Sequence, residues 1–389
     1  MRILHTSDWH LGHQHYNYDR QDEHQYFLDQ LAAHVREQRP DVLIVAGDVH
    51  HTPTPSIAAQ RQFSRNLLEL ANANPDMQIV IIAGNHDSGA RHEINDTLWQ
   101  THRVHLVGQL HNAGDEENPH IIRVPGKGNI VAIPYTPRVE YAQEMAREYV
   151  GQIIEDNPDN LPVILTTHAT IRGCDPTGHP DATEKIVGGI EASDIKGWGD
   201  ADYVALGHIH HPQDIATTSA AIARYSGSPI PINFDEAYSH SVTIVDIDRH
   251  NEAPRLEMLP ITPLREMTSL GEYGDWKEAL DTFKKFDAES TDYVRLNVRF
   301  SKDMPSDLDA RARVIAEDKN CRYCLINVRR EGQKKSSDPS EMTVNEIHEI
   351  TPQSLIEDYL RSCSIDFTGN LKNIFEEVMA EVNKDQREQ

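Results

Sequence analysis

The chain opens on a short apolar segment that runs into a carboxylate and an imidazole, Met1-Arg2-Ile3-Leu4-His5-Thr6-Ser7-Asp8-Trp9-His10-Leu11-Gly12. Apolar residues within positions 2–6 predict a strand, and the pair Asp8-x-His10 then lies in the loop that leaves its carboxyl end. Open α/β sheets bind their ligands at the carboxyl ends of their strands. Both side chains can therefore point at one divalent metal ion. Taken alone, however, the triplet fits an ordinary surface loop better.

Four further apolar segments end in polar side chains of the same kinds. They are residues 41–46 before Asp48, 78–82 before Asn85, 161–167 before His168, and 203–206 before His208 and His210. Apolar residues at helical spacing predict helices over 19–36, 57–70 and 140–154. This alternation of strands and helices predicts an α/β fold with a parallel sheet, so we expect the polar side chains after the first three strands to lie at the same edge of it. The donors after all five strands should then converge at one rim.

The five strand ends supply seven nitrogen and oxygen donors, which are Asp8, His10, Asp48, Asn85, His168, His208 and His210. Seven donors are too many for one metal ion and suit two ions bridged by a carboxylate. Because no thiolate is among them, manganese fits best, with zinc and iron as alternatives. Two ions roughly 3.5–4 Å apart clamp the attacking and leaving oxygens of a phosphoryl transfer. His86 could then protonate the leaving oxygen as general acid, with Asp87 orienting it.

Composition excludes some classes of protein. The 389 residues carry a formal net charge of −25, which argues against nonspecific nucleic-acid binding unless bound cations create a locally positive site. No apolar run approaches the ~20 residues of a membrane helix, and the N-terminus lacks a signal-peptide pattern, so we expect a cytoplasmic protein that binds no membrane. Cys321-x-x-Cys324 has one half of a zinc-site spacing, but no second pair of cysteines or histidines accompanies it. We therefore expect reduced structural thiols there.

The second part of the chain has a different organisation. Prolines punctuate residues 254–263, and we expect the first domain to span 1–263. Strands over 293–300 and 325–328 with a helix over 306–318 predict a small α+β domain at 264–336. A polar linker and C-terminal helices follow at 337–389, where Thr351-Pro352 is a typical helix start.

The order of motifs D-x-H, G-D, G-N-H-D, H and G-H-x-H resembles that of the calcineurin-like metallophosphoesterases. Within that family the likeness is strongest to DNA nucleases that work with a coiled-coil ATPase. The stretches that carry it are 6–12, 46–49, 83–88, 205–210 and 225–231. The likeness is close over residues 1–260 and only architectural beyond them. It implies a metallophosphoesterase sandwich with a small α+β capping domain and C-terminal helices.

The resemblance also implies roles for single residues. It assigns Asp8, His10, Asp48 and His210 to one metal ion, and Asp48, Asn85, His168 and His208 to the other. His86 matches the histidine that donates a proton in the transition state. His51 matches a second catalytic histidine of some relatives, where others carry aspartate. We expect the remaining neighbours, His5, His50 and His211, not to be ligands.

The activity that the resemblance implies is manganese-dependent cleavage of DNA in repair, recombination and replication. It would comprise an ATP-dependent 3′–5′ exonuclease on duplex ends and an endonuclease on single strands and hairpins. The partners would be DNA, a second copy of the chain and the ATPase subunit, in a nucleoid-associated heterotetramer with two copies of each subunit.

Three surfaces are candidates for these partners, each with an ordinary alternative. Helices near 57–70 and 91–100 would form the homodimer, or pack in the core. Basic residues between 311 and 335 would contact phosphate or form a solvated face; they are Arg311, Arg313, Lys319, Arg322, Arg329, Arg330, Lys334 and Lys335. The apolar stripe within 371–382 would dock on the ATPase coiled coil, or on its own domain.

Two other functions compete with a DNA nuclease. The first is a phosphatase or cyclic-nucleotide phosphodiesterase on the same core, although a small substrate needs neither the second domain nor the tail. The second is a binding scaffold with a vestigial site, which the complete set of donors argues against.

Overall fold

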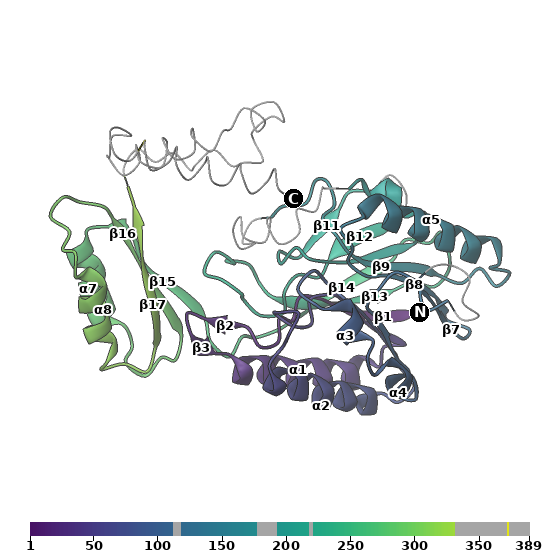
Figure 1. Cartoon of the computed structure of the whole chain (residues 1–389), viewed down its shortest axis with the longest axis horizontal. Coiled ribbons are helices and arrows are strands. Elements are labelled where there is room, and N and C mark those ends of the chain that lie inside the picture. Colours follow the sequence, from purple (N-terminus) through teal and green to yellow (C-terminus); the bar gives the residue numbers. More distant parts are fainter. Residues whose placement is uncertain (112–117, 177–192, 218–220, 331–371, 373–389) are drawn as a thin grey trace. The chain divides into compact units, whose positions relative to one another are not determined.

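The computed structural model describes residues 1–111, 118–176, 193–217, 221–330 and 372 (Figure 1). The chain divides into two compact units, Met1–Val328 and Arg329–Gln389. The predicted tail helices and the polar linker lie outside the described residues, so everything below concerns the first unit. None of its described helices is long and apolar enough to cross a membrane.

Two six-stranded sheets form the body of this unit. The first has the order β14-β13-β1-β4-β5-β6 and the second the order β11-β12-β10-β9-β8-β7. The strands of the first sheet are β1 (Arg2–Thr6), β4 (Val42–Ala46), β5 (Gln78–Ile82), β6 (Val104–Val107), β13 (Ser241–Asp246) and β14 (Arg255–Pro260). Those of the second are β7 (Ile121–Val124), β8 (Gly128–Ile133), β9 (Val163–His168), β10 (Tyr203–Gly207), β11 (Gln213–Ile215) and β12 (Ile222–Tyr225).

The sheets lie face to face, with helices on their outer sides. In β4, Ile44 packs between the sheets with Ile130 and Ile164, whereas Leu43 packs outward with Phe27. Successive side chains of β4 point to opposite faces, and both faces are covered, one by the second sheet and the other by helices. This explains the unbroken apolar run at 42–46. Figure 1 shows helices α1 (Gln21–Gln38) and α2 (Ile57–Ala73) along one sheet and α5 (Val139–Glu155) along the other. The predicted sandwich is therefore confirmed.

The strands that carry the candidate donors run parallel within each sheet. β1 pairs with β4 and β4 with β5 in the first sheet, and β9 pairs with β10 in the second. The first three of these strands therefore share one sheet edge, as predicted. The hairpin of β7 and β8 starts a second sheet to which β9 adds in parallel, so the ends of β9 and β10 belong to that sheet. The donors thus come from the carboxyl ends of strands in two facing sheets.

Residues 264–328, which we call the cap, have a core of their own. Their strands have the order β15-β16-β17, and helices α7 and α8 pack with them around Phe283, Leu296 and Ala312. The bounds are β15 (Met267–Gly274), α7 (Trp276–Lys285), β16 (Tyr293–Arg299), α8 (Leu308–Ala316) and β17 (Arg322–Arg329). The sequence pattern missed β15 and α7. No residue of β15 is fully buried, and the strand lacks a regular apolar alternation.

Shorter elements differ from prediction in detail. The helix expected near 91–100 is two short ones, α3 (Gly89–His92) and α4 (Asp96–Gln100). A hairpin, β2 (Gln14–His15) and β3 (Tyr18–Asp19), follows the first loop, and a short 3-10 helix, η1 (Ile195–Trp198), precedes β10. Tyr16 and Asn17 both have positive φ, which suits a two-residue hairpin turn.

Candidate metal centre

The loops that leave the strands are tied to one another through their backbones. Asp8 N–H donates to the carbonyl of Gly47 at 3.0 Å, which joins the loops after β1 and β4. His86 N–H donates to Asp48 Oδ1 at 2.9 Å, and His208 N–H donates to Asp8 Oδ1 at 3.0 Å. The four loops therefore fix one another without relying on solvent.

Several candidate ligands have a backbone conformation that L-residues seldom adopt. The φ angles are 54° for Asp8, 47° for His10, 50° for Asp48 and 100° for His208. Non-glycine residues with positive φ cost free energy and concentrate at functional sites, where the surrounding structure holds them. The strain here turns the side chains inward at the ends of their strands, which indicates a site built for a ligand.

One group of donors converges at Asp8, His10 and His210, whose ligand atoms lie within 4.8 Å of one another. The Nε2 atoms of His10 and His210 are 3.3 Å apart. Two donors each roughly 2.1 Å from one ion lie about 3 Å apart, so this spacing is suited to a shared cation. The donor set is carboxylate and imidazole, which fits a divalent metal ion.

A second group converges at Asn85, His168 and His208. Asn85 Oδ1 lies 2.9 Å from His168 Nε2 and 3.1 Å from His208 Nδ1. The amide nitrogen of Asn85 is buried without a hydrogen-bond partner, so its oxygen alone faces the histidines. This is the orientation that a metal ligand requires.

Asp48 lies between the two groups. Its Oδ2 atom is 3.8 Å from Nε2 of His10 and 3.4 Å from Nε2 of His168. This carboxylate oxygen is thus within 3.8 Å of a histidine from each group. The geometry is suited to a bridge between two cations.

All seven candidate donors are at least nine-tenths buried. Burial raises the pKa of the Asp8 carboxyl. Burial alone would lower the pKa of His168, but the Asp48 carboxylate and its hydrogen bond outweigh it and raise that pKa to about 9. Carboxylates in a desolvated site need compensating positive charge, which bound dications would supply. The residues present therefore fit a pair of metal ions.

Buried acceptors orient several of the histidines. His168 Nδ1 contacts the carbonyl of Ala46 at 2.8 Å, and His210 Nδ1 contacts Glu236 Oε1 at 3.2 Å. Such contacts fix which ring nitrogen faces a metal. Sequence reasoning missed Glu236, because an isolated glutamate in a loop carries no motif. It was recognisable only through its burial beside His210.

His86 and His51 lie beside the first group of donors. Their rings stack with centroids 5.4 Å apart, and together with His10 they form a further cluster of ligand atoms within 4.8 Å. His86 Nδ1 contacts the carbonyl oxygen of His51 at 2.9 Å, so Nδ1 carries the proton of the neutral ring. The structure brings both predicted catalytic histidines to the centre.

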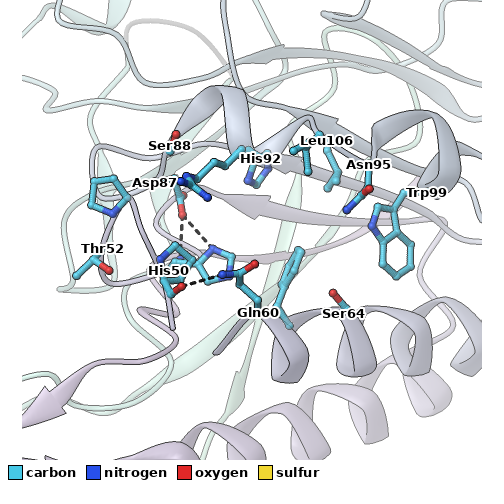
Figure 2. A pocket seen from close by; sticks show the side chains of 15 residues that line it. His50, Thr52, Gln60, Ser64, Asp87, Ser88, His92, Asn95, Trp99 and Leu106 are labelled. Atoms are coloured by element: carbon cyan, nitrogen blue, oxygen red, sulfur yellow. Dashed lines mark hydrogen bonds and ion pairs between the residues drawn. The ribbon is translucent and has the colours of Figure 1, made fainter. Parts of the chain in front are cut away.

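The expectation that Asp87 orients His86 was wrong, since that contact comes from the carbonyl of His51. The Asp87 carboxylate instead accepts hydrogen bonds from the backbone N–H groups of Val49, His50 and Gly84 at 2.9–3.1 Å. Figure 2 shows its contacts with His50. Burial opposes ionisation, but the contacts with His50 and the backbone hold the pKa of Asp87 at about 2. Asp87 therefore braces the loops after β4 and β5 against each other.

A cavity of about 150 Å³ lies behind this brace (Figure 2). His50 and Asp87 line it on one side, and Phe63 and Trp99 contribute aromatic walls. None of the seven candidate donors lines this cavity, so it is separate from the predicted metal site.

The histidines that we expected not to be ligands have other partners. His5 Nδ1 lies 2.9 Å from the hydroxyl of Tyr203. His50 Nδ1 lies 3.5 Å from Asp87 Oδ1, and His211 Nδ1 lies 3.3 Å from Asp175 Oδ2. Cys321 and Cys324 are buried free thiols in the cap.

The expected basic cluster is largely paired within the chain. Arg311 binds Asp307, Arg313 binds Asp309, and Lys319 Nζ donates to the carbonyl of Phe286. Arg322 binds Glu23 of the body rather than facing solvent. The exposed ion pairs of Arg311 and Arg313 favour the solvated-face alternative for these two residues, whereas Arg322 fits neither alternative. Lys334 and Lys335 lie outside the described residues.

The chain matches known proteins along most of its length. The family model described as calcineurin-like phosphoesterase matches residues 1–212. The SbcD subunit of the SbcCD nuclease from Bacillus subtilis is 31% identical over 304 residues, which cover 71% of this chain and 75% of that protein. The chain belongs to the SbcD family of calcineurin-like phosphoesterases.

Two further sequence comparisons agree with this SbcD membership, and one solved structure is reported beside them. The corresponding SbcCD nuclease subunit of Escherichia coli K12 is 34% identical over 268 residues, covering 62% of this chain and 65% of that one. A second model, described as the type 5 capsule protein repressor C-terminal domain, matches residues 262–363. A dimetal phosphatase from Danio rerio has a TM-score of 0.38 at 11% identity, covering 68% of this chain and 99% of that chain. The assignment to the SbcD family rests on the sequence relatives.

Proposed function

We propose that this SbcD-family chain is a DNA nuclease subunit that hydrolyses phosphodiesters with two divalent metal ions, Mn²⁺ by preference. The observation that carries the proposal is the position of Asp48, with a buried histidine from each donor group within 3.8 Å of one carboxylate oxygen. The names of the relatives, which call them nuclease subunits, supply the class of substrate.

In this proposal the two groups of donors hold one ion each. Asp8, His10, Asp48 and His210 hold the first, and Asp48, Asn85, His168 and His208 hold the second. The short separations of their ligand atoms support this division. Bound there, the ions would lower the pKa of an attacking water and offset charge on the phosphate. Nitrogen and oxygen donors without thiolates support manganese over softer metals.

His86 is the proposed general acid. Its Nδ1–H is held by the carbonyl of His51, so Nε2 faces the leaving oxygen. The ring would act as acid in its imidazolium form, in which Nε2–H is given to the leaving oxygen and the ring becomes neutral with its proton on Nδ1. Its backbone N–H is held by Asp48, which keeps the ring at a fixed place beside the ions. His51 stacks on this ring and contacts His10, so we assign it to orienting the phosphate and the acid.

The complex and its reactions extend the proposal. The subunit would act with two copies of SbcC and a second copy of itself, as an ATP-dependent 3′–5′ exonuclease on duplex DNA and an endonuclease on hairpins and single strands. This assigns it to DNA repair, recombination and replication, in the cytoplasm near the nucleoid. Three exposed apolar side chains support the homodimer surface: Ile57 on α2, Leu98 on α4, and Ile94 just before α4.

The domain plan belongs to the same proposal. Residues 1–263 would be the nuclease domain, 264–336 the DNA-capping domain, and 337–389 the segment that docks on the coiled coil of SbcC. The separate core of the cap supports the first boundary.

The test compares two substrates. The full chain with Mn²⁺ should cleave a hairpin DNA faster than bis(p-nitrophenyl) phosphate at equal concentration, and chelation by EDTA should abolish both reactions. Turnover of the small ester with intact DNA would favour the phosphatase or phosphodiesterase alternative instead.

A further inference from the structure

A buried ion-pair network joins the cap to the body of the protein. Glu23 at the start of α1 is only 2% exposed, yet its carboxylate receives three arginines and a tyrosine. The donors are Arg20 at 2.7 Å, Arg322 at 2.9 Å, Arg265 at 3.2 Å and the hydroxyl of Tyr293 at 2.7 Å. Tyr293 and Arg322 belong to β16 and β17, so this carboxylate is one of the groups that bind the cap to the body.

Arg20 extends the network towards the metal centre. Its side chain is 1% exposed, and one of its nitrogens, Nη1, donates to Nδ1 of His13 at 3.2 Å. Since a guanidinium can only donate, His13 accepts at Nδ1 and carries its proton at Nε2. Arg20 thus fixes both the tautomer and the orientation of the His13 ring.

His13 in turn packs against a histidine of the proposed catalytic pair. The rings of His13 and His51 have centroids 4.5 Å apart, and His51 Nδ1 lies 3.4 Å from Nδ1 of His10. The carbonyl of His51 holds His86. An unbroken series of contacts therefore runs from the cap through Glu23, Arg20 and His13 to His51.

The hairpin of β2 and β3 makes the same connection through the backbone. It follows directly on the loop that carries His10 and His13, and Figure 1 shows it between the body and the cap strands. The ring of His15 packs on Tyr293 at 5.0 Å, and the Tyr18 hydroxyl donates to the carbonyl of Tyr323. A movement of the cap would thus displace the segment that supports His13.

We infer that Arg20 is a positioning residue that couples the seating of the cap to the orientation of His51, an inference that rests on the proposed nuclease function. Joining two domains does not itself require buried charge, because apolar residues of equal volume serve as well or better. The hydrogen bonds of Arg20 to Glu23 and to His13 are directional, so they hold the His13 ring in one defined orientation where it packs on His51. DNA that shifts the cap would then set the histidine pair for cleavage.

The test replaces Arg20 and measures cleavage in two backgrounds. Arg20→Gln leaves Glu23 paired with Arg265 and Arg322, so no buried charge is orphaned. With Mn²⁺ and hairpin DNA, we expect kcat to fall about tenfold while KM and the number of bound ions stay within twofold. The same change should cause no further loss in a His51→Ala background, because coupled residues are not additive.

Arg36→Gln is the matched control, since Arg36 makes an exposed ion pair with Glu69 at the far end of α1. It should leave kcat unchanged. An Arg20→Gln chain with wild-type kcat, or an equal loss with and without His51, would overturn the inference and leave the nuclease proposal standing. An inactive wild-type chain would instead overturn the nuclease proposal and the inference with it.

Tyr293→Phe serves if Arg20→Gln does not fold. It removes one hydroxyl on the cap side of the network and leaves the Arg20–Glu23 pair intact. We expect kcat to fall about threefold, again only while His51 is present. An unchanged kcat in this variant would also overturn the inference.

Discussion

Asp48 has the most demanding position of the seven candidate donors. It has a positive φ, is 2% exposed, and accepts the backbone N–H of His86 on one oxygen while the other faces His10 and His168. A residue that needs both this backbone and this charge has few substitutes. The left-handed region tolerates aspartate and asparagine better than most residues, so asparagine keeps the fold while removing the charge.

His86 provides a test of the proposed chemistry at the scale of one side chain. His86→Gln should bind both ions and lose DNA cleavage by roughly 100-fold or more, because general acid catalysis contributes about 10²–10⁴. The measurement pairs cleavage rates with metal analysis of the same sample. His50→Gln is a suitable control, since His50 contacts Asp87 and is not assigned to catalysis. Loss of metal in His86→Gln would remove its assignment as the acid.

The close packing of the loops after β4 and β5 requires a glycine at position 84. A Cβ atom on Gly84 would lie 2.0 Å from Asp48 Oδ1 and 2.3 Å from the backbone nitrogen of Asp48. Real Cβ atoms do not approach backbone this closely, so one loop must move. Gly84 is therefore required for the approach of the two strand ends that carry Asp48 and Asn85.

Gly84→Ala should consequently weaken metal binding and destabilise the fold by roughly 1–3 kcal/mol, the usual cost of overpacking. Calorimetric titration with Mn²⁺ and urea unfolding measure the two effects. Gly151→Ala is the control, because nothing lies within 4 Å of its added Cβ and it stands on α5. Wild-type manganese affinity in Gly84→Ala would contradict the close approach of these loops.

Local sequence predicted the elements where periodicity is strong. The apolar runs at 42–46 and 78–82 are strands buried on both faces, and the polar residues after them lie where expected. The contacts between loops were not predictable in this way, because they join residues far apart in the chain. Asp87 bracing Val49 and Glu236 supporting His210 are both contacts of this kind. The pairing of Arg322 with Glu23 likewise needs the cap to be in place.

Buried histidines make the stability of the whole molecule depend on pH. His24 on α1 is fully buried, and burial followed by the charge of Arg20 lowers its pKa to about 3. The unfolded chain takes up this proton near the ordinary value of about 6.5. Stability present above pH 6.5 is therefore lost as the pH falls towards 3, by about 1.4 kcal/mol per pH unit for one group.

His24→Leu should reduce the pH dependence of the unfolding free energy by about one proton, because it removes the ring that titrates. It also removes two buried ring nitrogens without hydrogen-bond partners. Urea unfolding at pH 5, 6 and 8 measures the change. We expect the variant to gain most over the wild type at pH 5. An equal difference at all three values would mean that His24 does not titrate between the folded and unfolded states.

The proposed domain plan assigns DNA cleavage and SbcC binding to different segments, so it predicts the effect of a truncation. Removing residues 337–389 should leave manganese-dependent cleavage of hairpin DNA within a fewfold of the full chain and abolish binding to SbcC. Cleavage assays and co-purification with SbcC report the two properties separately. A truncated chain that still co-purifies would show that the contact lies within residues 1–336.

The most direct measurement is a manganese anomalous difference map from crystals of the full chain, collected for the wild type and for Asp48→Asn. The account predicts two peaks in the wild type roughly 3.5–4 Å apart. Both should contact Asp48, and at least one should be lost in the variant. A single ion, or a pair that does not touch Asp48, would contradict it.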